Sequence, residues 1–218
     1  MALGKNYDGQ DCSFARTLEV LGERWTLLVV RDAMYGVRRF ADFQAHLDIP
    51  KAVLSQRLAS LVAAGVLERR RYQDAPPRDE YVLTPMGREL WVPMLALAQW
   101  GERHLSERGP RRLFHHATCG ARLEPTSVCG ACGRLVSLEE VEVRPGPGLR
   151  DDTRDDLVSL ALRTPHRMLV PIPDKMGETP EGRSHELGRD RVRGRVAGVA
   201  RRGHAEGGDQ GAGAPARA

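Results

Sequence analysis

The stretch FADFQAHLDIPKAVLSQRLASLVAAGVLERRRY, residues 40–72, decides the fold of this chain. Its apolar residues first recur at helical spacing, which predicts a short helix over 40–47 and a second helix over about 51–64. The residues Asp-Ile-Pro at 48–50 form a tight turn between these helices. Gly65 follows the second helix at the position that favours a glycine C-cap. Two short helices joined in this way are typical of a helix-turn-helix.

The period of the apolar residues changes from helical to strand-like after this pair of helices. Residues 66–72, VLERRRY, and 79–84, DEYVLT, are rich in β-forming residues, and the intervening QDAPPR holds two prolines that forbid continued pairing. This order predicts a β-hairpin with a protruding loop that carries arginine. Two helices and a tight turn followed by a hairpin describe a winged helix-turn-helix. In that fold the second helix lies in the DNA major groove and the hairpin touches the flanking backbone.

The second helix of the pair has one apolar face, so its opposite face is the candidate DNA-reading surface. A helical wheel at about 100° per residue puts Leu54 and Leu58 on the core side and Gln56 on the other side. An amide such as Gln56 reads adenine through two hydrogen bonds, and an arginine such as Arg57 reaches guanine or a phosphate. The arginines of the hairpin concentrate positive charge where phosphates would run. The predicted DNA-binding residues are Arg39, Lys51, Ala52, Ser55, Gln56, Arg57, Ser60, Arg69, Arg70, Arg71 and Arg78. The alternative is a protein-interaction module, because runs of arginine are often only solvated.

Helical patterns also flank this region on both sides. Before it, apolar residues predict two helices, over about 12–21 and 24–34. After it, Thr84 at an N-cap position and Pro85 at the first helical position predict the start of a long helix. Pro93 should bend that helix, unless the helix begins later.

Five segments of the chain carry a resemblance to a known family. CSFARTLEVLGERWTLLVVRD, GVRRFADF, IPKAVLSQRLASLVAAGVLERRRY, PPRDEYVLTPMGREL and WGERH resemble the HxlR-type winged helix-turn-helix transcriptional regulators of the MarR-like superfamily. The resemblance covers about residues 12–105, nearly half of the chain. It implies a homodimeric DNA-binding regulator that reads a pseudo-palindromic site, with dimer contacts from the N-terminal region and from the long helix after the wing. The candidate interface residues are Leu90, Met94, Leu97 and Trp100, for which an intramolecular core is the alternative.

Cys12 stands alone ahead of the first predicted helix. Several relatives in this family carry a redox- or electrophile-sensing thiol at this position, so the resemblance implies the same role for Cys12. A cysteine near the start of a helix gains acidity from the partial positive charge there. One alternative is a buried small hydrophobe, as free cysteine often is. Another is control by a small aromatic or electrophilic effector bound at the dimer interface.

The stretch HHATCGARLEPTSVCGACGRLVSLEEV holds two pairs of metal-ligating residue types. His116 and Cys119 form the first pair, Cys129 and Cys132 form the second, and a glycine follows each pair. Three cysteines and one histidine are the donor set of a closed tetrahedral zinc site, so the segment looks like a zinc ribbon with structural zinc as its cofactor. The alternatives are a ribbon that has lost its metal, and His115 as the ligand in place of its neighbour. A redox CxxC has the least support, because no βαβ unit surrounds it.

We divide the chain into three segments. Residues 1–112 form the winged helix-turn-helix DNA-binding and dimerisation domain, and residues 113–144 form the zinc-ribbon-like segment. Residues 145–218 are expected to be a mostly disordered tail, because Pro, Gly, Arg and Asp dominate there without a sustained apolar pattern. Within it, DDLVSLALRTP is the one stretch that suggests a short helix. The expected fold class is α+β, mainly helical.

The composition limits the class of protein further. The chain has 218 residues and a formal net charge of +4, and only three of its 33 basic residues are lysines. The planar guanidinium of arginine is well suited to binding nucleic acid. A GC-rich genome, however, also raises the proportion of arginine among the basic residues. No stretch approaches the roughly 18 consecutive apolar residues of a membrane span, and the N-terminal residues lack the apolar segment of a secretory signal, so we expect a cytoplasmic protein. No nucleophile–base pair, phosphate-binding glycine loop or pair of carboxylates on one helix face indicates an enzyme. A zinc-stabilised interaction module is the remaining alternative.

Overall fold

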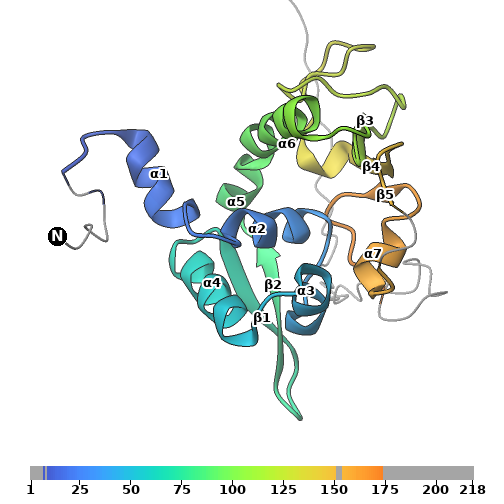
Figure 1. Cartoon of the computed structure of the whole chain (residues 1–218). Coiled ribbons are helices and arrows are strands. Elements are labelled where there is room, and N and C mark those ends of the chain that lie inside the picture. Colours follow the sequence, from blue (N-terminus) through green and yellow to red (C-terminus); the bar gives the residue numbers. More distant parts are fainter. Residues whose placement is uncertain (1–6, 8, 151–153, 174–218) are drawn as a thin grey trace, which may run out of the picture. The chain divides into compact units, whose positions relative to one another are not determined.

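The computed structural model describes Tyr7, residues 9–150 and residues 154–173, which form a mixed α+β fold (Figure 1). The winged-helix part contains α1 (Ser13–Leu21), α2 (Thr26–Met34), α3 (Phe40–Leu47), α4 (Lys51–Ala63), β1 (Leu67–Gln73), β2 (Arg78–Leu83), α5 (Pro85–Glu89) and α6 (Trp91–Leu105). The remaining elements are β3 (Arg112–His116), the 3-10 helix η1 (Leu138–Glu140), β4 (Val141–Pro145), α7 (Leu157–Ala161) and β5 (His166–Arg167). No helix of the described residues combines the length and the apolar character that crossing a membrane requires.

The predicted pair of helices and the tight turn between them are confirmed. Helix α3 ends at Asp48, whose backbone adopts the left-handed conformation with φ of 52°, and the buried Ile49 follows. Helix α4 then presents Leu54, Leu58 and Leu61 to the core, and none of these side chains is exposed to solvent. The apolar face therefore holds α4 against α2 and α3, and the polar face is left outside.

The predicted hairpin is also confirmed. Strands β1 and β2 are antiparallel, with Leu67 opposite Leu83 and Arg70 opposite Glu80, and the register shifts between Arg71 and Gln73. The buried ends of the strands anchor the hairpin in the core, whereas its tip projects past α3 and α4 (Figure 1). We call this hairpin, residues 67–83, the wing.

The region after the wing forms two helices, α5 and α6, so the second of the two expectations for Pro93, a long helix that begins later, is confirmed. The Thr84 hydroxyl accepts a hydrogen bond from the Gly87 backbone N–H at 3.1 Å, so Thr84 is the N-cap of α5. The chain leaves helical pairing at Leu90, and α6 begins at the next residue. Pro93 thus lies in the first turn of α6, where its missing N–H needs no helical partner. The long helix therefore begins later than Pro85.

The core continues from the winged-helix part into the cysteine-rich segment and beyond it. Strands β3, β4 and β5 form an antiparallel sheet in which β4 is central. Phe114 of β3 packs its ring edge-to-face on Trp91 of α6, with ring centroids 5.2 Å apart. Val141 and Val143 of β4 are buried in the same apolar cluster as the helices. One continuous core therefore supports both parts of the chain.

Residues 154–173 are packed, which differs from the tail expected to begin at residue 145. Val158, Leu162, Met168 and Ile172 are buried in the core. The backbone N–H of Leu169 donates to the Met34 carbonyl at 2.8 Å. These apolar residues are few and irregularly spaced, so they become ordered only because β4 and the end of α2 provide surfaces for them. Residues 151–153 and 174–218 of the expected tail lie outside the described residues.

Gly36 allows residues 168–172, which we call the C-terminal clasp, to approach α2 closely. Its φ is +90°, a conformation that residues with a Cβ rarely adopt. A Cβ added there would lie 1.8 Å from the Val170 carbonyl oxygen. The Gly36 carbonyl also accepts a hydrogen bond from the Ile172 N–H at 3.2 Å. A side chain at this position would therefore separate the clasp from α2.

Substituting Gly36 tests this contact. We expect Gly36→Ala to lower the free energy of unfolding by about 2 kcal/mol, since the alanine suffers both backbone strain and a steric clash. The matched control is Gly101→Ala in α6, where a Cβ meets no atom within 4 Å. Replacing that helical glycine should stabilise the protein by about 0.5–1 kcal/mol. Urea denaturation measures both, and equal effects of the two variants would contradict the close approach.

Candidate nucleic-acid interface and metal cluster

The outer face of α4 carries the polar residues predicted to read DNA. Lys51, Ala52, Ser55, Gln56 and Ser60 are all exposed. They lie opposite the buried leucines because the helical repeat separates the two sets by about half a turn. Among the described residues, the segments that follow α6 in sequence leave Gln56 uncovered.

Arg57 has a different environment from its neighbours on α4. Its Nη2 atom lies 3.1 Å from a carboxylate oxygen of Glu23, in the loop before α2. Only 14% of the Arg57 side chain is exposed, whereas Gln56 beside it is open to solvent. The Arg57 side chain thus ties α4 to the loop between α1 and α2. Sequence reasoning assigned it to DNA because Glu23 is far away in the chain.

The arginines of the wing are paired with carboxylates of the same hairpin. Arg69 and Arg71 both donate to Asp79 through their Nε atoms, each at 2.7 Å. These hydrogen bonds, that from Arg71 above all, lower the pKa of the Asp79 carboxyl below its ordinary value. Arg70 forms an ion pair with Glu68 on the same strand.

Arg39 and Arg78 both lie at the distal half of the wing, Arg39 beside it and Arg78 within it. Arg39, just before α3, stacks its guanidinium over the Tyr72 ring at 4.9 Å from the ring centroid. Its backbone also pairs with that of Glu80. Arg78 is exposed at the start of β2. The predicted wing residues thus remain at the surface, but the structure gives Arg69, Arg70 and Arg71 acidic partners.

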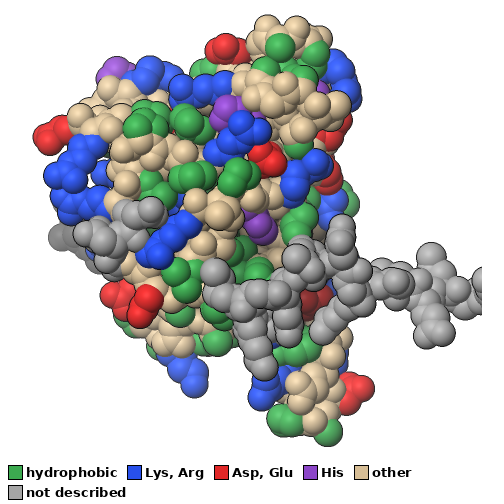
Figure 2. Space-filling view, turned by 90° about the vertical axis from the view of Figure 1, so that its right-hand side faces the viewer, with side chains coloured by type: hydrophobic (Ala, Val, Ile, Leu, Met, Phe, Trp, Pro, Cys, Tyr) green, Lys and Arg blue, Asp and Glu red, His purple; other side chains and the backbone are tan. Residues whose placement is uncertain are grey.

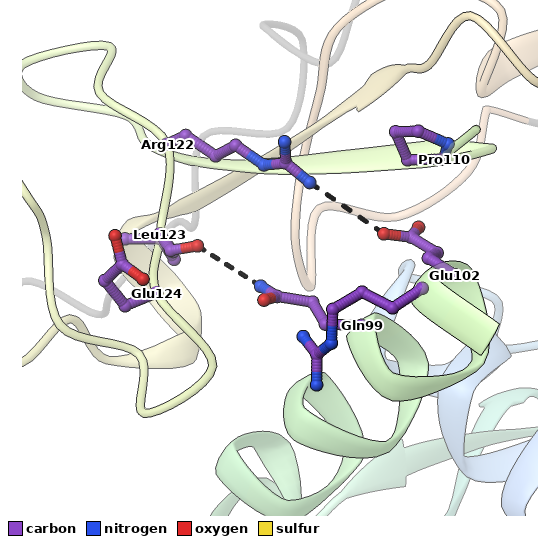
Figure 3. Close-up of a pocket in the computed structure, with 7 residues that line it drawn as sticks. Gln99, Glu102, Pro110, Arg122, Leu123 and Glu124 are labelled. Atoms are coloured by element: carbon purple, nitrogen blue, oxygen red, sulfur yellow. Dashed lines mark hydrogen bonds and ion pairs between the residues drawn. The ribbon is translucent and has the colours of Figure 1, made fainter.

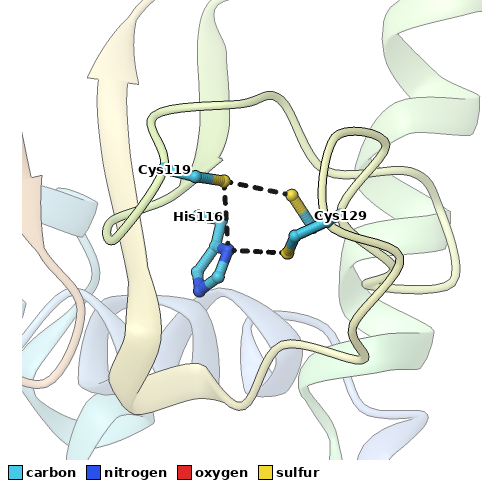
Figure 4. A group of neighbouring side chains, drawn as sticks. His116, Cys119 and Cys129 are labelled. Carbon is cyan, nitrogen blue, oxygen red and sulfur yellow. Dashed lines mark hydrogen bonds between the residues drawn. The ribbon is translucent and has the colours of Figure 1, made fainter.

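The four predicted metal ligands are brought together by two turns. His116, Cys119, Cys129 and Cys132 place one donor atom each within 4.8 Å of the others. The Nδ1 atom of His116 lies 3.3 Å from the Cys119 sulfur and 3.4 Å from the Cys132 sulfur, and the side chains point toward a common centre (Figure 4). This cluster is able to bind a metal ion.

Two further contacts favour this donor set. The neighbouring His115 turns away, and its Nδ1 atom lies 2.9 Å from the Gly120 carbonyl oxygen, so His116 is the histidine of the cluster. Backbone N–H groups of Cys132 and Ala131 donate to the Cys129 sulfur and lower the pKa of its thiol to about 6. The thiolate is the form of cysteine that binds metal. We call residues 116–136 the knuckle.

Hydrogen bonds connect the knuckle to α6. The indole N–H of Trp91 donates to the Ser127 hydroxyl at 2.7 Å, and that hydroxyl donates to the Val136 carbonyl at 2.8 Å. All three residues are buried. Farther along α6, Gln99 donates to the Leu123 carbonyl at 3.2 Å, and Arg122 lies 3.9 Å from Glu102 across a cleft of about 430 Å³ (Figure 3). The position of the metal cluster therefore depends on α6.

Apolar side chains are exposed along α6. Leu97 and Trp100 are 55% and 48% exposed, whereas Leu90 and Met94 are half-buried against the core. Two of the four predicted interface residues thus pack against the core, and the other two expose about half of their surface. Phe14 of α1 is 70% exposed as well.

Cys12 is exposed and occupies the N-cap position of α1. This placement removes the alternative of a buried small hydrophobe. Its thiol is accessible to a reagent, and it is remote in sequence from the three cysteines of the cluster.

The comparisons with known proteins agree with this architecture. The family described as HxlR-like helix-turn-helix matches residues 20–109. The HTH-type transcriptional regulator Rv3095 of Mycobacterium tuberculosis is 41% identical over 149 residues, which cover 68% of this chain and 93% of that protein. The HTH-type transcriptional regulator YdeP of Bacillus subtilis is 32% identical over 106 residues, covering 47% of this chain and 83% of that protein.

Solved structures give a weaker likeness. The crystal structure of PA1607 is 33% identical and covers 66% of this chain and 94% of that chain, with a TM-score of 0.45. The redox regulator HypR in its oxidized form is also 33% identical, covers 43% of this chain and 97% of that chain, and has a TM-score of 0.40. Both TM-scores are below 0.5, so the assignment rests on the sequence identity. The chain belongs to the HxlR-like helix-turn-helix family, and it is a transcriptional regulator with a DNA-binding fold rather than an enzyme.

Proposed function

We propose that the chain regulates transcription by binding a specific pseudo-palindromic DNA site as a homodimer. The observation that carries this proposal is the exposed polar face of α4, with Gln56 at its centre and the arginines of the wing beside it. In this arrangement Gln56, Lys51, Ser55 and Ser60 lie along the major groove, while Ala52 lets the helix approach the base edges. The wing contacts the flanking phosphates through Arg70 and Arg78.

The proposed dimer uses the exposed apolar residues of α1 and α6. Phe14, Leu97 and Trp100 each expose about half of their surface or more, so a partner that covers them would remove apolar surface from water. A two-fold dimer would place two α4 helices about one turn of DNA apart, so that each reads one half-site. A small effector at this interface remains an alternative prediction for the control of DNA binding.

Arg57 has a supporting role in this proposal rather than a reading role. Its ion pair with Glu23 is half-buried on the arginine side, so the guanidinium would have to leave that carboxylate to reach a base. We therefore assign base recognition to Gln56 and positioning of α4 to Arg57.

Replacing Gln56 and Arg70 separates base reading from phosphate binding. We expect Gln56→Ala to reduce discrimination between the selected duplex and single-base variants by about 1–3 kcal/mol, while its affinity for random duplex is unchanged. Arg70→Ala should weaken binding to all duplexes alike and reduce the salt slope of log affinity by about 1. Sites are selected from random duplex DNA, and fluorescence anisotropy then measures the affinities. A uniform loss in both variants would refute the proposed orientation of α4.

The same titration addresses Cys12, whose exposed thiol at the N-cap of α1 supports a redox- or electrophile-responsive role. Diamide treatment should change the affinity of the wild-type protein and leave Cys12→Ser unaffected. An equal response of both proteins would remove this role.

Asp79 restrains the two arginines that it binds. Removing its charge in Asp79→Asn should free Arg69 and Arg71 for phosphates, raise the affinity for random duplex about threefold to tenfold and steepen the salt slope by about 1. Asp74→Asn is the matched control, since it makes the same change of charge at the exposed tip of the wing without an ion pair to release among the described residues. Equal effects of the two variants would show that only net charge matters.

We further propose that the metal of the Cys3His cluster is structural zinc. The four donors, three cysteine sulfurs and one histidine nitrogen, complete a tetrahedral shell, which leaves no position for a substrate. The Nδ1 atom of His116 faces the sulfurs of Cys119 and Cys132, and its buried Nε2 atom has no hydrogen-bond partner among the described residues. The bound metal would hold the two turns of the knuckle together, since a segment of this size has little core of its own.

Metal analysis and Trp91 fluorescence test the zinc site. We expect one zinc per chain in the wild type and in the control Cys12→Ser, and below about 0.2 in Cys129→Ser, because the remaining three donors bind zinc far more weakly. Chelation should change the fluorescence of Trp91, whose indole N–H binds Ser127 of the knuckle. Full-length protein without zinc and with unchanged fluorescence after chelation would reject the site.

A further inference from the structure

A cavity of about 240 Å³ lies where the C-terminal part of the described chain packs against α2 and α3. Arg31 and Tyr35 line it from α2 and its end, and His46 lines it from α3. Its other lining residues come from the start of β3 and from the chain around α7. None of the residues proposed to bind DNA or metal lines this cavity, so neither function explains it.

Arginine dominates the wall of the cavity. Six of the ten lining residues are Arg31, Arg111, Arg112, Arg150, Arg154 and Arg163, and no acidic side chain of the described residues lines it. Lys and Arg side chains also gather in several clusters on the side of the molecule that carries α7 (Figure 2). Guanidinium groups that line one small space repel one another. Asp32 and Asp156 offset part of this repulsion at Arg31 and Arg154, and an anion in the cavity would offset more of it.

The wall formed by α2 and α3 is the first wall, and a buried carboxylate holds its side chains in place. Asp32 has no solvent exposure, and it accepts hydrogen bonds from Arg31 at 2.7 Å and contacts His46 Nδ1 at 2.7 Å. The Arg31 guanidinium lies over the Tyr35 ring, 5.8 Å from its centroid. These contacts fix the direction of Arg31 before any ligand binds.

The second wall comes from the start of β3 and the chain around α7, and backbone carbonyl groups hold its arginine side chains. Arg154 donates to the Ala45 carbonyl at 2.6 Å, Arg163 donates to the Arg154 carbonyl at 2.9 Å, and Arg112 donates to the Leu162 carbonyl. These carbonyl oxygens orient the guanidinium groups that donate to them. Asp156 is the acidic partner of Arg154 and also caps α7. Both walls are therefore ordered, which lowers the entropic cost of ligand binding.

We propose that this cavity, which we call the arginine cavity, binds a compact polyanion, a small molecule with two or more phosphate groups. Guanidinium groups bind phosphate through paired N–H donors, and several of them suit a ligand of multiple negative charge. The volume is below the roughly 300–1,000 Å³ of pockets for drug-sized ligands, so a pyrophosphate group or a phosphorylated sugar is the appropriate size. The inference is independent of the proposed DNA site.

Calorimetric titration of the full chain with sodium pyrophosphate at constant ionic strength tests this site. We expect saturable binding of one pyrophosphate per chain, with affinity at least about tenfold lower in Arg150→Gln and in Arg163→Gln. Arg78→Gln in the wing is the matched control and should bind like the wild type. The wild type and the three variants have the same metal cluster. Any binding of pyrophosphate to a metal there is therefore equal in all four proteins and cancels when their affinities are compared.

A variant tests the site only if it still folds. Arg150 is exposed and makes no hydrogen bond or ion pair with another described residue, so Arg150→Gln should retain the wild-type circular dichroism and thermal midpoint. Absence of saturable binding, or the same loss of affinity in Arg78→Gln, would overturn the proposal. So would an Arg150→Gln variant that binds pyrophosphate normally but duplex DNA more weakly, because the wall would then contact the DNA backbone.

Discussion

The buried carboxylate of Asp32 is the interaction on which much of the structure depends. It lies on α2 without solvent exposure and joins Arg31 of the same helix to His46 of α3. Burying an isolated charge costs several kcal/mol, so Asp32 requires both partners, and it thereby fixes α3 relative to α2. Since α3 leads through a three-residue turn into α4, the same carboxylate helps to set where the DNA-reading helix lies. It also orients Arg31 at the wall of the arginine cavity.

The segments that follow α6 in sequence pack against the winged-helix part and support it. Trp91 connects α6 to the knuckle through Ser127 and to β3 through Phe114. The C-terminal clasp meets the end of α2 at Gly36. A metal ion in the knuckle would thus bear on α6, which the proposed dimer uses, and an anion in the arginine cavity would bear on α2 and α3, against which α4 packs. No residue of the proposed DNA-reading face of α4 lines the arginine cavity or belongs to the cysteine-histidine cluster.

The apolar periodicity of the sequence was sufficient to predict the helices, the tight turn and the wing. Leu54, Leu58 and Leu61 recur at helical spacing because they fill the core, and the exposed position of Gln56 follows from the same repeat. The cluster of His116, Cys119, Cys129 and Cys132 was predictable for a similar reason, since two potential metal ligands on each tight turn are a local feature. Within residues 154–173 the short helix α7 was predicted from DDLVSLALRTP, but the packing of the segment was not, because its four buried apolar side chains pack against surfaces built by distant parts of the chain.

The sequence by itself therefore determined the winged-helix architecture, the family and the four members of the cysteine-histidine cluster, all of which are encoded by residues close together in the chain. Only the tertiary structure decided which arginine side chains are paired with carboxylates and which line a cavity. It paired Arg57 with Glu23 and brought Asp79 to Arg69 and Arg71. It also gathered six arginines from distant segments around one cavity. The physical reason is that a guanidinium is neutralised or left available by whatever lies near it in space, and local sequence patterns carry no information about those neighbours.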